Sequence, residues 1–280
     1  MTVYHIEQKA YQIRQSIIKM LLAAGSGHSA GSLGLADIFS ALYFRVLKHK
    51  PKRPDWPKRD RLLLSNGHVV PVWYATLAEA GYFSKSQLKT LRALDSLLQG
   101  HPHRGSVPGI ENTSGPLGQG VSVAVGHALA LVRQKSNSRV FCITSDGEQQ
   151  EGQTWEAYLL AVKEKLTNLT FILDRNNIQI DGFTENILPL EPLRAKLAAF
   201  GLHVLEVDGH NVKAFIDTCS EADAVREKPV VIIAHTIPGK GVDFMEFDPA
   251  WHGKSPTSSQ ATKALVDLRT LQGRIRAEHE

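Results

Sequence analysis

The sequence has little cysteine and no long apolar run. Its 280 residues include two cysteines, Cys142 in an apolar run and Cys219 in an expected helix. This pattern predicts neither a disulfide framework nor a thiolate metal site. No uninterrupted apolar stretch is long enough to span a bilayer, and the first residues lack the basic-then-apolar pattern of a signal peptide. We therefore expect a cytoplasmic chain that does not enter a membrane.

Neither sign of charge dominates the chain. It has 32 basic and 28 acidic residues, and its formal net charge is +4. The most visible basic run, residues 48–61 (KHKPKRPDWPKRDR), also holds prolines and aspartates, as solvated surface loops do. Basic residues do not recur on one helix face with aromatic residues between them, so we do not expect nucleic-acid binding. Electrostatic attraction of anionic substrates by this run stays open as an alternative.

Apolar runs and helical patterns alternate through most of the chain, and no Pro/Gly/Ser-rich linker divides it. The buried-strand candidates are residues 61–66, 139–144, 169–174, 203–209 and 230–236, and the helical patterns are residues 6–27, 35–47, 121–134, 153–166 and 193–201. This alternation predicts an α/β fold in which a parallel β-sheet carries helices on both faces. We expect one large domain at residues 1–258 and a helical tail at 259–280, with residues 121–134 forming a core helix.

Polar residues follow two of the expected strands directly. Ser145-Asp146-Gly147 follows the strand at 139–144, and Asn176 follows the strand at 169–174, 176 − 146 = 30 residues later. Thirty residues is about one strand–helix–strand unit, so a carboxylate and an amide oxygen meet at one sheet edge. Such donors suit Mg²⁺ or Ca²⁺, and Mg²⁺ usually also binds phosphate oxygens. The alternative is that Asp146 only caps the next helix.

These two segments resemble the thiamine-diphosphate motif in its transketolase version. The matching residues read S-D-G-x3-E-G and, after 30 residues, N-x-I-x-I-D-G, with Ser145 where glycine is usual. The resemblance implies the diphosphate-binding (PP) fold of thiamine-diphosphate enzymes. It also implies a Mg²⁺ ion, replaceable by Ca²⁺ or Mn²⁺, held by Asp146, Asn176 and the carbonyl of Ile178. Gly147 would let backbone N–H groups approach the diphosphate.

Several of the twelve histidines lie next to a glycine in loops. An imidazole there can bind a hydroxyl, contact phosphate or move a proton near neutral pH. The resemblance implies that His68 and His252 contact the diphosphate and help proton movement. His28 and His101 would contact sugar hydroxyls. His127, inside an apolar run, and His210, between an expected strand and helix, are instead expected to be structural.

Three further segments match the same family. T-S-G-P-L-G-Q-G at residues 113–120 resembles a specific signature, which implies that backbone groups at Gly115 and Leu117 face the aminopyrimidine side of the cofactor. The resemblance also implies that Glu151 and Glu156 relay protons to a glutamate of a partner, the alternative being plain helix-start acids. Lys240 lies in a family-like loop and either closes over phosphate or is an ordinary surface lysine.

The resemblance covers residues 11–256, whereas transketolases are usually more than twice as long. It therefore implies the N-terminal subunit of a split transketolase, which is inactive without a separate C-terminal subunit. An assembly with two copies of each chain is expected. The expected reaction moves a two-carbon ketol unit from a ketose phosphate to an aldose phosphate. Alternatives are a deoxyxylulose phosphate synthase-like enzyme, a 2-oxo acid decarboxylase subunit, or a non-catalytic cofactor-binding subunit.

Overall fold

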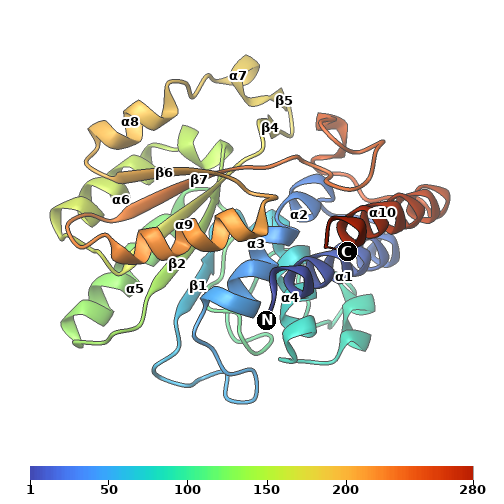
Figure 1. Cartoon of the computed structure of the whole chain (residues 1–280), viewed down its shortest axis with the longest axis horizontal. Helices are drawn as coiled ribbons and strands as arrows, with labels where there is room; N and C mark the ends of the chain where they lie inside the picture. The colour runs from blue at the N-terminus through green and yellow to red at the C-terminus, as the bar shows by residue number, and fades with distance from the viewer. Residues whose placement is uncertain (280) are drawn as a thin grey trace.

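A five-stranded parallel sheet forms the centre of the computed structural model, which describes residues 1–279 (Figure 1). The strand order is β1-β2-β3-β7-β6, and a two-stranded antiparallel ribbon, β4-β5, lies beyond the end of β3. The strands are β1 (Arg61–Leu64), β2 (Val140–Ser145), β3 (Leu169–Arg175), β4 (Ile178–Gln179), β5 (Gly182–Phe183), β6 (His203–Asp208) and β7 (Val230–His235).

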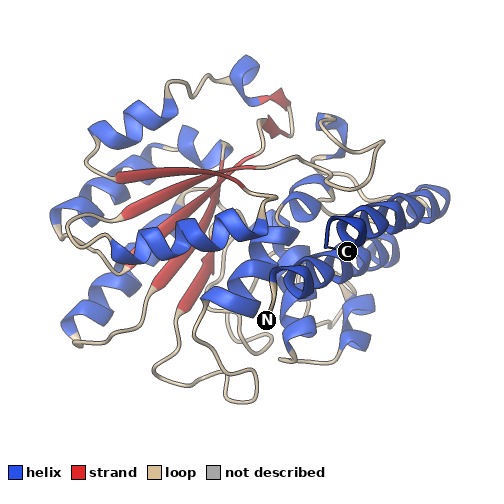
Figure 2. Ribbon diagram, in the orientation of Figure 1, coloured by secondary structure: helices blue, strands red, loops and turns tan. Residues whose placement is uncertain are grey.

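Helices cover both faces of this sheet (Figure 2). The α-helices are α1 (Val3–Ala24), α2 (Ala30–Gly34), α3 (Ala36–Ala41), α4 (Val70–Ala80), α5 (Gln119–Arg133), α6 (Gly152–Lys163), α7 (Thr184–Ile187), α8 (Leu193–Ala199), α9 (Val212–Ala224) and α10 (Ser258–His279). Short 3₁₀ turns span Gly67–Val69, Lys85–Thr90, Gly147–Gln150 and Pro249–Trp251, and a π-helical turn spans Leu42–Val46.

The strands divide their side chains strictly between two cores. Leu62 and Leu64 of β1 pack in the core that α1, α3, α4, α9 and α10 cover, whereas Leu63 packs in the core under α5, α6 and α8. The same alternation runs through β2, where Phe141 joins the first core and Cys142 the second. Successive side chains of a strand point to opposite faces. A sheet that is buried on both faces therefore needs the continuous apolar runs seen in this sequence.

The prediction of a parallel sheet with helices on both faces is confirmed. All five strand candidates form strands within two residues of the expected bounds. β2 and β3 are parallel neighbours, with Ser145 opposite Asp174 in the register. The loops that follow these two strands therefore leave the sheet at the same edge, as the 30-residue spacing predicts.

Two helix predictions need correction. The expectation of a core helix at residues 121–134 is wrong, because α5 buries one face only and leaves Val123 and Val132 more than 40% exposed. His127 on this helix is half-buried rather than part of the core. The helical pattern at 35–47 is not one α-helix, because it changes to a π-helical turn at Leu42.

The C-terminal tail forms a regular helix. α10 lies beside α1 (Figure 1), and its buried residues Ala261, Ala264 and Leu268 join the core on that side of the sheet. Small side chains at the first two positions allow a close approach of the helices. The boundary at residue 258 stays a prediction. Among the described helices, none combines the length and the apolarity that crossing a membrane requires.

A buried ion pair joins the first helices to the sheet. The guanidinium of Arg14, which is 1% exposed, donates to both carboxylate oxygens of Asp37 at 2.9 and 2.5 Å. His210 Nδ1 lies 2.7 Å from the same carboxylate, and its Nε2 accepts the backbone N–H of Ile237 at 2.7 Å. The ring therefore carries its proton on Nδ1. Despite burial, the charge of Arg14 and the bond from His210 hold the pKa of Asp37 well below its usual range.

Replacing Asp37 tests how much this network contributes to stability. Asp37→Asn leaves the Arg14 charge buried without a counter-charge, so we expect the free energy of unfolding to fall by about 3 kcal/mol or more. The matched control is Asp217→Asn, which breaks an exposed pair with Lys213 and is expected to cost less than about 0.5 kcal/mol. Urea unfolding of both variants measures the difference. Equal losses would show that burial does not decide the contribution of Asp37.

Candidate active site

A cleft of about 400 Å³ opens beyond the carboxyl ends of β2 and β3. This is the edge at which parallel α/β sheets bind ligands. Ten of the twelve predicted site residues line this cleft, and the other two, Asp146 and Glu156, do not. The ten are His28, His68, His101, Gly115, Leu117, Gly147, Glu151, Asn176, Ile178 and His252. The fold therefore brings together loops that lie far apart in the sequence.

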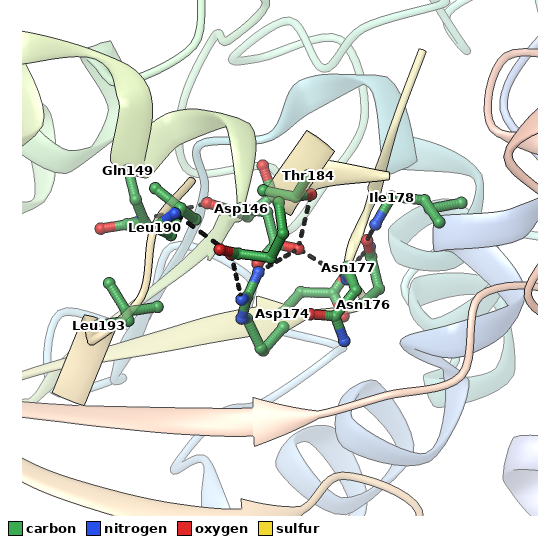
Figure 3. Close-up of polar contacts among 12 residues, drawn as sticks. Asp146, Gln149, Asp174, Asn176, Asn177, Ile178, Thr184, Leu190 and Leu193 are labelled. Atoms are coloured by element: carbon green, nitrogen blue, oxygen red, sulfur yellow. Dashed lines mark hydrogen bonds and ion pairs between the residues drawn. The ribbon is translucent and has the colours of Figure 1, made fainter. Parts of the chain in front are cut away.

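Asp146 lies fully buried between the lining residues Ser145 and Gly147. Its Oδ2 accepts the N–H of Asn177 at 2.6 Å and the hydroxyl of Thr184 at 3.2 Å, and Arg175 Nη1 lies 3.2 Å away (Figure 3). Its Oδ1 has no hydrogen-bond partner among the described residues. Its side chain also does not cap the following turn, contrary to the capping alternative. A buried acceptor without a partner is costly, and a cation would satisfy it.

Asn176 lines the cleft with its side chain fixed by hydrogen bonds. Its Nδ2 donates to Asp174 at 2.8 Å, which turns Oδ1 toward Ile178, whose N–H it accepts at 3.0 Å. Asp174 is itself fixed, because its other carboxylate oxygen accepts the hydroxyl of Thr236. Burial raises the pKa of Asp174 to about 7, although its hydrogen bond from Thr236 opposes the rise.

Residues 113–120 contain a glycine-rich turn that packs against the end of β1. Gly118 has φ +82°, in the left-handed region that favours glycine. A Cβ on Gly120 would lie 2.5 Å from Ser65, so a glycine there lets the start of α5 lie directly against the end of β1. Leu117 and Gly115 thereby line the cleft together with Asn176. This packing explains two glycines of the octapeptide in physical terms.

The sequence reasoning missed Glu148. This fully buried carboxylate accepts the N–H of Gly118 at 2.7 Å, the N–H of Ser145 at 3.1 Å and the hydroxyl of Ser65. It thus joins the ends of β1 and β2 to the glycine-rich turn. Burial raises its pKa to about 7. The acidic stretch contained the signal, but Ser65 is 83 residues away, and nothing in the spacing separates Glu148 from Glu151.

Glu151 and Glu156 lie at the start of α6 with exposed side chains. The described residues offer neither side chain a hydrogen bond or an ion pair, and Glu151, at the N-cap position, makes no side-chain capping bond. Glu151 lines the cleft, whereas Glu156 lies one helical turn further along α6. Both carboxylates therefore point to surface that this chain leaves open.

Three histidine rings pack closely at one end of the cleft. Ring centroids are 4.9 Å apart for His28 and His68, 5.3 Å for His68 and His252, and 5.6 Å for His28 and His252. Burial lowers the pKa of all three, to about 4 for His28, where the charges of His252 and His101 add to the effect. Burial and Arg92 also lower the pKa of His101. At neutral pH these rings are uncharged hydrogen-bonding groups.

Lys240 does not line the cleft. Its neighbours Gly239 and Gly241 both have positive φ, and a Cβ on Gly239 would meet the backbone of Met245 at 2.4 Å. The loop is therefore packed, and Lys240 Nζ lies 4.0 Å from Glu246 near α10. In this loop the two glycines serve close packing.

Residues 6–267 match the family model described as transketolase, thiamine diphosphate binding domain. The chain belongs to the transketolase family. It is 41% identical to the 6-deoxy-6-sulfo-D-fructose transketolase subunit SqwG of Clostridium sp. (strain MSTE9) over 94% of this chain and 96% of that protein. It is also 41% identical to an apulose-4-phosphate transketolase subunit of Actinobacillus succinogenes, with the same coverage.

Longer transketolases match through one part of their length. Human transketolase is 35% identical over 94% of this chain but only 42% of its own length. The solved transketolase of Leishmania mexicana superposes with a TM-score of 0.88 at 29% identity, covering 99% of this chain and 45% of that one. The chain thus spans less than half of a full-length transketolase and nearly the full length of named transketolase subunits. The predicted identity as an N-terminal transketolase subunit is confirmed.

The histidine cluster predicts how stability depends on pH. The folded state holds the pKa of His28 at about 4, below its ordinary value of 6.5, so the unfolded chain takes up the proton first. Wild type therefore loses stability relative to His28→Asn as pH falls from 6.5 to 4, by up to about 2 kcal/mol after allowance for partial exposure. Urea unfolding at pH 7 and 5 measures this, with the exposed His103→Asn as control. A difference independent of pH would contradict it.

Proposed function

We propose that this chain is the cofactor-binding subunit of a two-component transketolase that moves a two-carbon ketol unit from a ketose phosphate to an aldose phosphate. One observation carries the proposal: the buried Oδ1 of Asp146 has no hydrogen-bond partner among the described residues, and Asn176, whose chain neighbour Asn177 donates to the same carboxylate, lines a cleft together with four histidines. The donor set fits a divalent cation with phosphate ligands, since one carboxylate, one amide and one carbonyl leave room for diphosphate oxygens.

Each predicted site residue has a task in this proposal. Asp146, Asn176 and the carbonyl of Ile178 would hold Mg²⁺, with Ca²⁺ or Mn²⁺ as substitutes. Thiamine diphosphate, when bound, supplies a carbon nucleophile and an electron sink. His68 and His252 bind its diphosphate, and backbone groups at Gly115 and Leu117 face its aminopyrimidine. His28 and His101 bind sugar hydroxyls. The lowered pKa values keep these histidines uncharged at neutral pH, and an uncharged ring has one nitrogen that can accept a hydrogen bond or a proton.

The proposal also includes a second chain, the partner, which completes the enzyme. The first relatives are named as subunits, and the match to longer transketolases covers less than half of their chains. The outer surfaces of α5 and α6 expose Val123, Val132, Leu159 and Leu160 by 41–56%. We take these exposed apolar side chains on two neighbouring helices as part of the interface with the partner. Glu151 and Glu156 on α6 would then face the partner's glutamate, in an assembly with two copies of each chain.

The cysteines support a location in the cytoplasm. Cys142 and Cys219 are both free and buried, which is usual in the reducing cytoplasm. Burial raises the pKa of both thiols, so neither is a reactive thiolate. We therefore keep cytoplasmic location as part of the proposal.

Complementation tests the division of the enzyme. The purified chain, with Mg²⁺ and thiamine diphosphate, is expected to show no ketol transfer between sugar phosphates, because the glutamate that activates the aminopyrimidine lies in the other chain. We expect the cognate C-terminal chain to restore ketol transfer. A coupled assay of the aldose phosphate released measures this transfer. Full activity of the lone chain would contradict the proposal. Release of CO₂ from a 2-oxo acid by the assembled complex would favour the decarboxylase alternative.

Removal of the Asp146 carboxylate tests the cation site. Asp146→Ala is expected to weaken Mg²⁺-dependent binding of thiamine diphosphate to the assembled complex by at least about 100-fold, because the cation loses its only carboxylate ligand. The control is Asp181→Ala, which removes a carboxylate from the same cleft without touching the cation ligands. Calorimetric titration with and without Mg²⁺ gives both affinities. Unchanged binding in Asp146→Ala would refute the ligand assignment.

A further inference from the structure

A single buried cation connects the proposed metal carboxylate to one wall of the cleft. Arg175 is the last residue of β3, and its side chain is 4% exposed. Its guanidinium meets three carboxylates: Asp146 at 3.2 Å through Nη1, and Glu185 and Glu191 at 2.7 and 2.9 Å through Nη2. The contact with Asp146 is an ion pair without a hydrogen bond, whereas Nη2 donates hydrogen bonds to both glutamates.

The three carboxylates belong to different parts of the chain. Asp146 follows β2, Glu185 lies in α7, and Glu191 lies just before α8. Glu185 also accepts the backbone N–H groups of Leu190 and Glu191 at 3.2 and 3.4 Å. The carboxylate of Glu191 accepts the N–H of Leu193 at 2.8 Å, which places it at the start of α8.

The segment tied down in this way forms one side of the cleft. We call residues 185–191 the cleft wall, because Ile187 lines the cleft from this segment. Ile187 and Leu188 are each about half exposed, so apolar packing alone holds the wall weakly. Side chains from outside the wall bind it at three places: through Arg175, through a bond from Gln150 to the carbonyl of Leu188, and through a bond from Lys196 to the carbonyl of Leu190. Of these three side chains, only Arg175 also contacts Asp146.

The same guanidinium helps to determine which oxygen of Asp146 is free. All polar contacts of this carboxylate gather on Oδ2, from Arg175, the N–H of Asn177 and the hydroxyl of Thr184. Oδ1 is left without a partner among the described residues. A carboxylate can rotate about its Cβ–Cγ bond, and a cation beside Oδ2 favours the orientation in which that oxygen stays turned toward Arg175. The free oxygen is then presented as a single, monodentate ligand.

We propose that Arg175 is a positioning residue with two tasks: it orients the Asp146 carboxylate so that Oδ1 alone faces the cation site, and it anchors the cleft wall to that carboxylate. Loss of the guanidinium therefore releases both the wall and the carboxylate. Loss of one glutamate releases the wall alone. The functional consequence rests on the proposed cation site, whereas the two contacts can be tested in the metal-free chain.

Amide hydrogen exchange of the full, metal-free chain, resolved by residue in NMR spectra, tests the two contacts separately. Arg175→Met keeps the apolar stem and removes the charge. We expect the amide of Asn177, which donates to Asp146, and the amides of Leu190 and Glu191, which donate to Glu185, to exchange about tenfold faster. The amide of Ile172, inside β3, serves as internal reference and is expected to exchange at an unchanged rate.

Two matched variants separate positioning from general support of the fold. Glu191→Gln removes one anchor, so the Leu190 amide exchanges faster while Asn177 keeps its wild-type rate. Arg175→Lys carries one compact charge, which pairs with the more deeply buried Asp146; it restores slow exchange at Asn177 but leaves the wall amides fast. An unchanged Asn177 rate in Arg175→Met would overturn the proposal. Equal acceleration at Ile172 would also overturn it, because that outcome shows only global destabilisation.

The assembled enzyme supplies a second measurement. Arg175→Met is expected to raise the Mg²⁺ concentration for half-maximal binding of thiamine diphosphate about tenfold, whereas Arg175→Lys stays within about threefold of wild type. If neither the wild-type complex nor any variant complex binds the cofactor, the proposed function is contradicted. The exchange rates of the metal-free chain then still decide the role of Arg175. Cofactor binding with the same Mg²⁺ requirement in all variants would contradict the first task of Arg175.

Discussion

The structure depends on a buried carboxylate that has one oxygen satisfied and one oxygen free. Asp146 lies at the end of β2 with no exposed surface, where an isolated negative charge is costly. Burial accordingly raises its pKa to about 6, even though Arg175 opposes the rise. A ligand of opposite charge at this sheet edge would offset that cost. A divalent cation, as proposed for this site, would be such a ligand and would turn the repulsion between carboxylate and diphosphate into attraction.

Burial also changes the ionisation of the groups around the cleft. Burial raises the pKa of Asp146, Glu148 and Asp174 and lowers the pKa of His28, His68 and His252. Both shifts in pKa favour the uncharged form of these groups around the cleft. The acids act chiefly as acceptors that fix loops, since Glu148 holds the glycine-rich turn and Asp174 orients Asn176. The histidines stay neutral and available to bind oxygen atoms of a ligand or to take up a proton.

Much of this arrangement could be predicted from the sequence because it follows from strand order. Apolar runs identified the five strands, and the 30-residue spacing of Asp146 and Asn176 placed their loops at one edge. The motif resemblance then selected four histidines that do gather at the cleft. Contacts between distant residues could not be predicted in this way: the bonds from Ser65 to Glu148 and from Arg175 to Glu191 depend on how loops fold back. The exposed face of α5 was also missed, since an apolar pattern does not reveal whether a helix packs within its own chain or faces a partner.

The most direct test of the central claim is a crystal structure of the chain with its partner, thiamine diphosphate and Mn²⁺, in which anomalous scattering locates the cation. We expect one Mn²⁺ ion within about 2.3 Å of Asp146 Oδ1, Asn176 Oδ1 and the carbonyl oxygen of Ile178, and also bound to diphosphate oxygens. A cation bound to the diphosphate but more than about 4 Å from either Asp146 or Asn176 would contradict it.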